Sequence, residues 1–440
     1  METVDSLIHG KWIAPVVPSG QILENHTLVI NGSKIREIIP TNEVIGRYQA
    51  HQQSNLNDHL LLPGFINAHS HSAMSLFRGI ADDMPLKSWL EKHIWPLEKQ
   101  HVNESFVADG TRLAICEMLR SGTTCFADMY FFPESAAEAV TESGIRTRLG
   151  IVISDNETAY AADTDEYFTK GLEFADNYKH HPLINTQFAP YTPNTVSDAA
   201  LTRTLMLSTE LSIPIQMHIH ETESEVSEAV ASTGKRPLKR LQELGLLTPD
   251  LQAVHMTDLL DDEVELLASC GVHVIHCPES NMKLASGICP VEKLLQAGVN
   301  VALGTDGAAS NNDLNMLGEM RTTALLAKVA SKNASAVSAK TVLEMATING
   351  AKALGLEDQI GSLEIGKQAD IIAVDMSAIE QQPLYNPISQ LVYTSNPNQI
   401  TDLWVAGRHL MKGRQLTTLN VQTIVENAKQ WQRSLLVKKN

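Results

Sequence analysis

The 440-residue sequence predicts an α/β fold, in which a (β/α)8 barrel carries a small composite β-sandwich. Three observations support this prediction. Apolar, strand-like stretches alternate with helical stretches through the middle of the chain, short strands and turns occupy both ends, and polar side chains recur where several predicted strands end. Such an alternation is typical of parallel strands joined by helices, and a barrel of this kind has its active site at the carboxyl ends of its strands.

The two ends of the chain predict the smaller unit. Residues 28–35 read as strand, turn and strand around Asn31-Gly32, which is a strong two-residue hairpin signal. Near the other end, residues 370–374 resemble a strand and residues 403–411 a second hairpin. We therefore predict a composite β-sandwich domain from residues 1–60 and 356–440, with a catalytic barrel of residues 61–355 inserted between its halves.

The stretch LLPGFINAHSH, residues 61–71, predicts the first barrel strand. An apolar run interrupted by Pro63-Gly64 leads to His69 and His71. Residues two apart in a strand point to the same side, and imidazole is a common metal ligand. Two histidines on one strand hold a cation only if further ligands come from elsewhere in the chain.

The other seven barrel strands are predicted at residues 123–128, 148–153, 183–189, 213–220, 252–255, 272–276 and 299–305. Helical segments lie between them. Residues 104–119 form a helix that stops before Ser121-Gly122. Thr222 and Glu225 have capping-box spacing, and residues 314–329 carry apolar side chains at helical spacing.

Polar side chains stand at the ends of four of these eight strands. The fifth strand ends in His218 and His220 and is followed by Glu221, the sixth ends at His255, and the eighth leads to Asp306. Each residue alone is ambiguous, since a single histidine at a strand end is usually structural. Four strands of eight that end in this way are a much sharper signal of a metal site. His220 points away from His218, so we predict a packing role for it.

Composition narrows the class of partner. The net charge of −17 disfavours nucleic acid and anionic membranes, because phosphates would be repelled. The sequence shows no secretory signal and no apolar run of roughly 20 residues, the length that a membrane span needs. Five scattered cysteines without a CxxC pair indicate reduced thiols of a cytoplasmic protein rather than disulfides or a structural thiolate site.

Five blocks carry a resemblance to a known family: PGFINAHSH at residues 63–71, LFRGIADD at 76–83, MHIHET at 217–222, HCPESNMKL at 276–284 and GTDGAASNN at 304–312. The chain resembles the amidohydrolase superfamily and, within it, the 5′-methylthioadenosine/S-adenosylhomocysteine deaminase group, over nearly its whole length. The resemblance implies a TIM-like metal-dependent hydrolase barrel. It is compatible with a homodimer or homotetramer, although no residue pattern indicates either.

The resemblance also implies the site. One divalent metal ion, Zn²⁺ or alternatively Fe²⁺, would be held by His69, His71, His218 and Asp306. Catalysis would involve Glu221 as a proton shuttle and His255 beside the attacking water, together with Asp306. The substrate would contact Glu98 through its ribose hydroxyls, and also Tyr191, Glu221, Ser310 and Trp89.

The chemistry suits these residue types. Three imidazoles and a carboxylate leave room for water on zinc, and the metal lowers the pKa of that water from 15.7 to about 7. General acid–base help from a carboxylate is typically worth about 10²–10⁴ in rate. Residues 183–191 contain no lysine that could be carbamylated to bridge two ions, which favours a single metal.

A long segment after the first strand, residues 72–98, mixes apolar side chains with acidic ones and predicts an active-site lid. Trp89 would supply an apolar wall for a purine, or would pack in the ordinary way. Glu98 could accept hydrogen bonds from two vicinal hydroxyls.

Two departures from the group pattern bear on the substrate. Tyr191 stands where the group usually has a histidine, and a tyrosine differs in length and does not become charged near neutrality. No arginine lies between Arg148 and Arg203 to hold the carboxylate of a homocysteine tail, and Arg146 and Arg148 are predicted within or beside the third strand.

The predicted activity is metal-dependent hydrolytic deamination of an adenosine-type nucleoside, 5′-methylthioadenosine ahead of S-adenosylhomocysteine, which gives 5′-methylthioinosine and ammonia. The alternative enzyme acts on another aminated ring, such as guanine or a triazine. A non-catalytic scaffold on the same barrel is the alternative from another class, and the presence of every metal ligand disfavours it.

Overall fold

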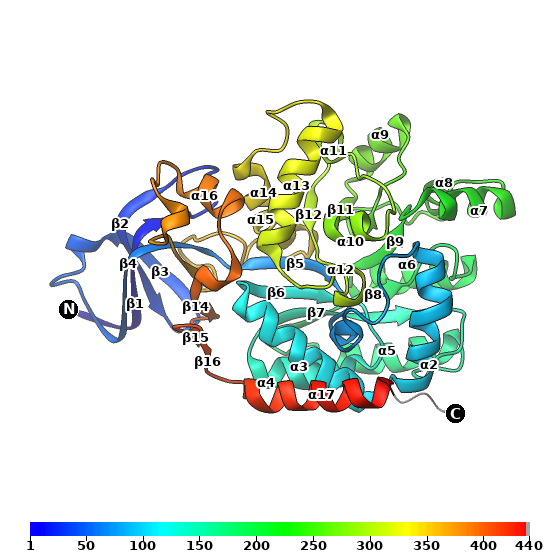
Figure 1. The fold of residues 1–440 in the computed structure, drawn as a ribbon, viewed down its shortest axis with the longest axis horizontal. Coiled ribbons are helices and arrows are strands. Elements are labelled where there is room, and N and C mark those ends of the chain that lie inside the picture. Colours follow the sequence, from blue (N-terminus) through cyan, green and yellow to red (C-terminus); the bar gives the residue numbers. More distant parts are fainter. Residues whose placement is uncertain (437–440) are drawn as a thin grey trace.

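The computed structural model describes residues 1–436, and its larger sheet is a barrel of eight parallel strands (Figure 1). Neighbouring strands follow one another in chain order, and the sheet closes where the backbone N–H of Asp306 donates to the carbonyl oxygen of His69 at 3.1 Å. The (β/α)8 prediction is confirmed. The strands are β5 (Phe65–Ser70), β6 (Thr123–Asp128), β7 (Arg146–Ile153), β8 (Ile184–Pro190), β9 (Ile215–Ile219), β10 (Leu251–His255), β11 (His273–His276) and β12 (Val301–Leu303).

Helices connect the barrel strands. Gly122, with φ of +91°, ends the helix before β6 as predicted, since a left-handed backbone suits glycine. The Thr222 hydroxyl caps α7 by accepting from the N–H of Glu225, but the Glu225 carboxylate accepts from Glu221 instead of closing a capping box. The helices are α3 (Glu104–Arg120), α4 (Pro133–Ser143), α5 (Thr164–Tyr178), α6 (Asp198–Leu211), α7 (Glu223–Thr233), α8 (Pro237–Glu243), α9 (Asp261–Cys270), α10 (Pro278–Lys283), α11 (Val291–Gln296), α12 (Ala308–Asn311), α13 (Met316–Ser331), α14 (Ala339–Met345) and α15 (Ile348–Ala353).

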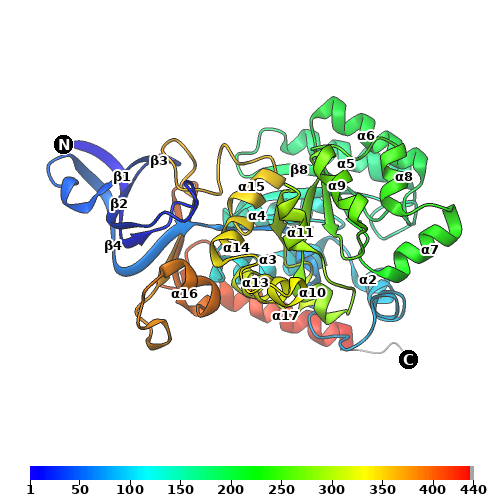
Figure 2. The same ribbon diagram turned by 90° about the horizontal axis from the view of Figure 1, so that it is seen from above.

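Strands from both ends of the chain share a second, mixed eight-stranded sheet. Figures 1 and 2 show this sheet beside the barrel. The predicted hairpin pairs Ile30 with Ile35 and Asn31 with Lys34. In sheet order the strands are β16 (Gln415–Leu416), β15 (Arg408–Lys412), β14 (Ile400–Val405), β13 (Ile371–Asp375), β4 (Tyr48–Pro63), β1 (Glu2–Ile13), β2 (Leu23–Asn31) and β3 (Lys34–Pro40).

The predicted first barrel strand is divided between the two sheets. Leu61 and Leu62 pair with β13 in the smaller sheet, and the barrel strand begins only at Phe65. Gly64 lies at the junction, where a Cβ atom would come within 2.1 Å of the Thr124 side chain. The apolar run is continuous because both sheets are buried here, so hydrophobicity alone does not mark the change of sheet.

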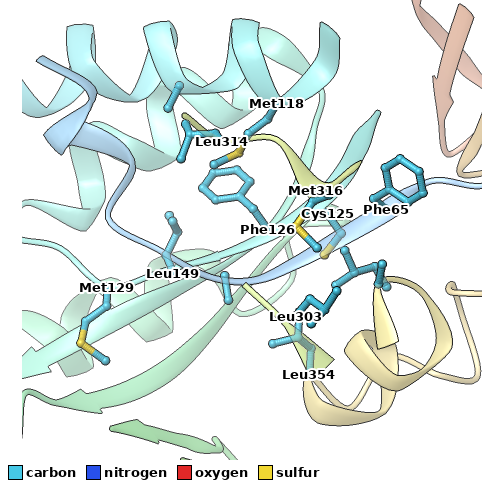
Figure 3. Packing of buried hydrophobic residues seen from close by; sticks show 14 of the residues in the cluster. Phe65, Met118, Cys125, Phe126, Met129, Leu149, Leu303, Leu314, Met316 and Leu354 are labelled. Atoms are coloured by element: carbon cyan, nitrogen blue, oxygen red, sulfur yellow. The ribbon is translucent and has the colours of Figure 1, made fainter. Parts of the chain in front are cut away.

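Apolar side chains pack between the barrel and its helices (Figure 3). Phe65 and Phe126 lie on adjacent strands, while Met118 on α3 and Leu314, just before α13, contribute to the same cluster. All four side chains are fully buried. This close-packed layer holds the strands, and therefore the side chains at their ends, in fixed positions.

The last helix, α17 (Val421–Leu436), runs along the outside of the barrel beneath α3 (Figure 1). Its Trp431 ring packs against Phe106 and donates its indole N–H to Asp109. None of the described helices combines the length and the hydropathy that crossing a bilayer requires. All five cysteines are free thiols.

A buried ion pair joins the two sheets. Arg146 on β7 makes two hydrogen bonds, of 2.9 and 3.1 Å, to Asp370 just before β13. Removing one partner leaves a buried charge without its counter-ion, which costs about 3–5 kcal/mol. We therefore expect Asp370→Ala to lower the free energy of unfolding, measured by urea titration, by that amount.

The exposed pair between Arg203 and Asp165 provides the control. Asp165→Ala should change the free energy of unfolding by less than about 1 kcal/mol, since exposed pairs contribute little. Equal effects of Asp165→Ala and Asp370→Ala would contradict this account of the junction.

Candidate metal centre and active site

Four side chains converge at the carboxyl end of the barrel. His69 and His71 come from the end of β5, His218 from β9, and Asp306 follows β12. All four are buried, and one ligand atom from each lies within 4.8 Å of the others. The Nε2 atom of His218 is 3.2 Å from Nε2 of His69 and 3.3 Å from Nε2 of His71.

Hydrogen bonds fix the orientation of each imidazole. The Nδ1–H of His71 donates to the carbonyl oxygen of Met129 at 2.6 Å, and that of His218 to the carbonyl oxygen of Tyr191 at 2.8 Å. The Nδ1–H of His69 donates at 2.7 Å to Oε1 of Gln216. Because Nδ1 carries the proton in each neutral ring, the Nε2 lone pairs face the shared centre.

The carboxylate of Asp306 is oriented in the same way. Its Oδ1 lies 3.2 Å from Nε2 of His71 and 3.5 Å from Nε2 of His69. Its Oδ2 accepts from the hydroxyls of Ser280 at 2.6 Å and Ser310 at 2.9 Å. Oδ1 therefore faces the histidines, while Oδ2 is held by the two serine hydroxyls.

This arrangement requires a positive charge at its centre. Three nitrogen lone pairs and a carboxylate oxygen repel one another unless a cation lies between them. Burial lowers the pKa of His71, but Asp306 more than offsets that effect and raises it to about 9, whereas burial lowers the pKa of His69 and that of His218. Imidazole nitrogens with one carboxylate are a donor set for divalent metals. These four residues could therefore hold a divalent metal ion.

Glu221 and His255 lie beside the metal ligands, as predicted. Glu221 begins the loop after β9, and its Oε2 is 3.7 Å from Nε2 of His255. Burial, and then the charge of Asp306, raises the pKa of Glu221 to about 8. A carboxyl group with such a pKa can both give and take a proton near neutrality.

His255 is held in a strained backbone conformation, with φ of +78°. Left-handed backbone in a residue other than glycine is uncommon and is found at functional sites. The Nδ1–H of His255 donates to Oδ1 of Asn281 at 2.9 Å, so Nε2 faces Glu221. His220 takes the packing role predicted for it: it is buried, donates to Asp258 and accepts from the N–H of Leu238.

A cavity of about 230 Å³ opens above the metal ligands. Its outer wall is the segment after β5, which folds as η2 (Ser72–Phe77), α1 (Leu86–Trp89), the π-helical turn η3 (Leu90–Ile94) and α2 (Trp95–His101). The substrate contacts predicted from the sequence all line this cavity: Glu98, Tyr191, Glu221, Ser310 and Trp89.

These lining residues differ in what they can still contact. Trp89 is 5% exposed, and its indole N–H donates to the carbonyl oxygen of Ala81. The Ser310 hydroxyl donates to Asp306, so its first role is to hold that carboxylate. Glu98 accepts from the hydroxyl of Tyr130 at 2.8 Å. The ring of Tyr191 packs against His218, with the ring centroids 5.0 Å apart.

The two arginines of β7 are directed away from the cavity, in agreement with their predicted place in the third strand. Arg146 pairs with Asp370, and Arg148 donates to the carbonyl oxygens of Thr186 and Leu354. Neither lines the cavity.

Several residues of the site were missed by sequence reasoning. Ser280 and Asn281 lie in the block at 276–284, where their position between two strand ends was the available signal. Gln216 lies two residues before His218, on the same face of β9. Tyr130, two residues beyond the end of β6, gave no signal of its own.

Comparison with known proteins agrees with this geometry. The family model described as Amidohydrolase family matches residues 60–410. The chain is 51% identical over 437 residues to a 5-methylthioadenosine/S-adenosylhomocysteine deaminase of Teredinibacter turnerae, covering 99% of both chains. It is 40% identical to a 5′-deoxyadenosine deaminase of Methanococcoides burtonii, covering 97% of this chain and 96% of that one.

A solved structure gives the same result. A crystal structure of an adenosine deaminase from Xanthomonas campestris with bound zinc superimposes with a TM-score of 0.98, at 47% identity and covering 99% of both chains. The match to the family model and the full-length identities lead to one conclusion. The chain belongs to the amidohydrolase family.

Proposed function

We propose that the protein catalyses the hydrolytic deamination of an adenosine-type nucleoside, with 5′-methylthioadenosine preferred over S-adenosylhomocysteine. One observation carries the proposal: a single cavity is lined by three of the candidate metal ligands (His71, His218 and Asp306), by Glu221 and, on its lid wall, by Glu98. An adenosine-type nucleoside fits this arrangement, with its aminated ring at the metal and its ribose beside the carboxylate of Glu98. The names of the relatives at 40–51% identity support the same class of substrate.

The reaction replaces the amino group at C6 of the purine by oxygen from water. A metal ion held by His69, His71, His218 and Asp306 would lower the pKa of a bound water from 15.7 to about 7. We propose zinc, because three histidines and a carboxylate suit it and because the similar Xanthomonas campestris deaminase is described with bound zinc.

The side chains of the chain itself move the protons. Glu221 lies where its carboxyl group can give a proton to the ring nitrogen as oxygen adds to C6. That proton would come from the attacking water, and Glu221 would then take the second proton from the oxygen on C6 and pass it to the departing amine, which leaves as ammonia. His255, with Nε2 3.7 Å from Glu221, is placed to accept a hydrogen bond from the attacking water.

The charged side chains that line the cavity support the preference for the uncharged methylthio group. Glu91, Glu225 and Glu228 line the cavity, and Lys87 is the one lysine or arginine of its described lining. Lys87 is already paired with Glu228 at 2.9 Å. The carboxylate of a homocysteine tail would find no unpaired lysine or arginine in this lining, whereas a methylthio group needs no counter-charge.

A substrate panel tests the proposal. Metal-replete protein is incubated separately with 5′-methylthioadenosine, S-adenosylhomocysteine, adenosine and guanine, while ultraviolet absorbance and ammonia are followed. We expect the highest kcat/KM for 5′-methylthioadenosine. Turnover of guanine without turnover of any nucleoside would overturn the proposed substrate and favour a deaminase of free bases.

A rim variant tests the role of charge. Glu228 forms an ion pair with Lys87, so Glu228→Gln leaves the Lys87 ammonium free to pair with the carboxylate of a homocysteine tail. We expect the ratio of kcat/KM for S-adenosylhomocysteine to kcat/KM for 5′-methylthioadenosine to rise by about two- to fivefold, the size expected for one exposed charge pair. Glu243→Gln is the matched control, since it releases Lys235 in a pair that does not line the cavity. An unchanged ratio in Glu228→Gln would show that the charges of Lys87 and Glu228 do not decide between the two substrates.

A further inference from the structure

Tyr130 connects the core of the barrel to the lid. It lies two residues after the end of β6, is 6% exposed, and donates its hydroxyl to Oε1 of Glu98 at 2.8 Å. The two residues are 32 positions apart in the chain. This hydrogen bond therefore joins a fixed strand end to α2, a helix of seven residues in the lid.

Glu98 depends on this contact for its orientation. Within residues 1–436, the Tyr130 hydroxyl is the one hydrogen-bond donor to its carboxylate, whose other oxygen, Oε2, receives none. The side chain is long and flexible, and it stands on a short helix that follows a π-helical turn. Burial raises the pKa of Glu98 to about 7, against the effect of the hydrogen bond from Tyr130.

The segment that carries Tyr130 also orients a metal ligand. The carbonyl oxygen of Met129 accepts from Nδ1 of His71, and the Tyr130 ring lies with its centroid 6.5 Å from that of His71. Two consecutive residues thus set the position of the metal end of the cavity and that of the Glu98 carboxylate. The distance between the candidate metal ligands and the Glu98 carboxylate is therefore set by the residues that follow β6.

We propose that Tyr130 is a positioning residue for ribose recognition. Its hydroxyl occupies Oε1 of Glu98 and directs Oε2 into the cavity, where Oε2 accepts from the vicinal 2′ and 3′ hydroxyls of the nucleoside. The contact thereby places the purine ring at the metal. This inference rests on the proposed function and adds to it the residue that makes Glu98 selective for a ribose with both hydroxyls.

Tyr130→Phe is the direct test, because it removes the hydroxyl and keeps the ring. A hydrogen bond to a charged group is worth about 1.5–3 kcal/mol, which corresponds to roughly a tenfold to hundredfold change. We expect KM for 5′-methylthioadenosine to rise by about that factor, while kcat falls by less than about threefold. Metal content and Tm should match those of the wild type.

A pair of ligands separates positioning from general damage. Adenosine and 2′,3′-dideoxyadenosine differ only in the two hydroxyls, and each is measured as a competitive inhibitor against 5′-methylthioadenosine. Tyr130→Phe should raise the inhibition constant of adenosine by about tenfold or more. It should leave that of 2′,3′-dideoxyadenosine within about twofold of the wild-type value. In a Glu98→Gln background, Tyr130→Phe should add little further weakening, since both changes act on one contact.

Tyr160→Phe is the matched control. The Tyr160 hydroxyl also donates to a glutamate, Oε1 of Glu134 at 3.3 Å, but neither residue lines the cavity. Tyr160→Phe should therefore leave the inhibition constants of adenosine and of 2′,3′-dideoxyadenosine unchanged.

Each outcome decides the matter. If Tyr130→Phe raises both inhibition constants by the same factor, or raises neither of them, Tyr130 does not position Glu98 and the inference is overturned. If Tyr130→Phe does not fold, the inference falls when Glu98→Gln weakens the binding of adenosine and of 2′,3′-dideoxyadenosine by the same factor. Wild-type protein that turns over and binds no nucleoside overturns the proposed function and this inference with it, whereas wild-type activity with no Tyr130 effect overturns this inference alone.

Discussion

Glu221→Gln lowers kcat by about 10²–10⁴-fold, the range that general acid–base catalysis contributes, and leaves metal content and fold intact. Glutamine has nearly the same shape as the carboxyl group but cannot carry a proton between water, ring and leaving amine. Glu221 lies next to His255 and at the inner end of the cavity, and burial raises its pKa to about 8. Steady-state kinetics with 5′-methylthioadenosine and metal analysis of the same sample provide the measurement.

Glu223→Gln is the matched control for this prediction. Glu223 lies two residues after Glu221, at the start of α7, and is exposed, so its neutralisation should change kcat by less than about twofold. A Glu221→Gln enzyme that retains most of its activity would remove Glu221 from the proton transfers.

Asp306→Ala abolishes metal binding and, with it, turnover. The substitution removes the one carboxylate among the four ligand groups, and the remaining imidazoles carry no negative charge to offset that of a divalent ion. We expect metal content, measured by elemental analysis after dialysis, to fall from near one equivalent toward zero. Wild-type protein stripped with a chelator should likewise lose its activity and regain it with Zn²⁺.

Ser310→Ala provides a graded comparison. Its hydroxyl is one of two that hold Oδ2 of Asp306, so its loss should weaken metal binding by about tenfold to hundredfold without abolishing it. An Asp306→Ala protein that binds metal as tightly as the wild type would contradict the assignment of Asp306 as a ligand.

Much of this architecture could be predicted from local pattern. Apolar stretches of strand length located all eight barrel strands to within a few residues, because a parallel strand covered on both faces is apolar along its whole length. Polar residues at strand ends then indicated where the site lies, since all carboxyl ends of a barrel meet at one edge, and the family resemblance singled out four of them as candidate metal ligands.

What could not be predicted depends on contacts between distant parts of the chain. Gln216 supports His69 across 147 residues, and Tyr130 reaches Glu98 across 32. No spacing rule connects such pairs. The junction at Gly64 escaped prediction for a related reason: it is marked by close packing against Thr124, while the apolar pattern runs through it unchanged.

The most direct measurement follows the atoms of the reaction. Metal-replete protein is incubated with 5′-methylthioadenosine in water enriched in oxygen-18, and the products are identified by mass spectrometry with ammonia quantified in parallel. The account predicts 5′-methylthioinosine with one oxygen-18 atom at C6 and one ammonia released per molecule. Release of free adenine, or no conversion by protein that carries its metal, would contradict a hydrolytic deaminase of this nucleoside.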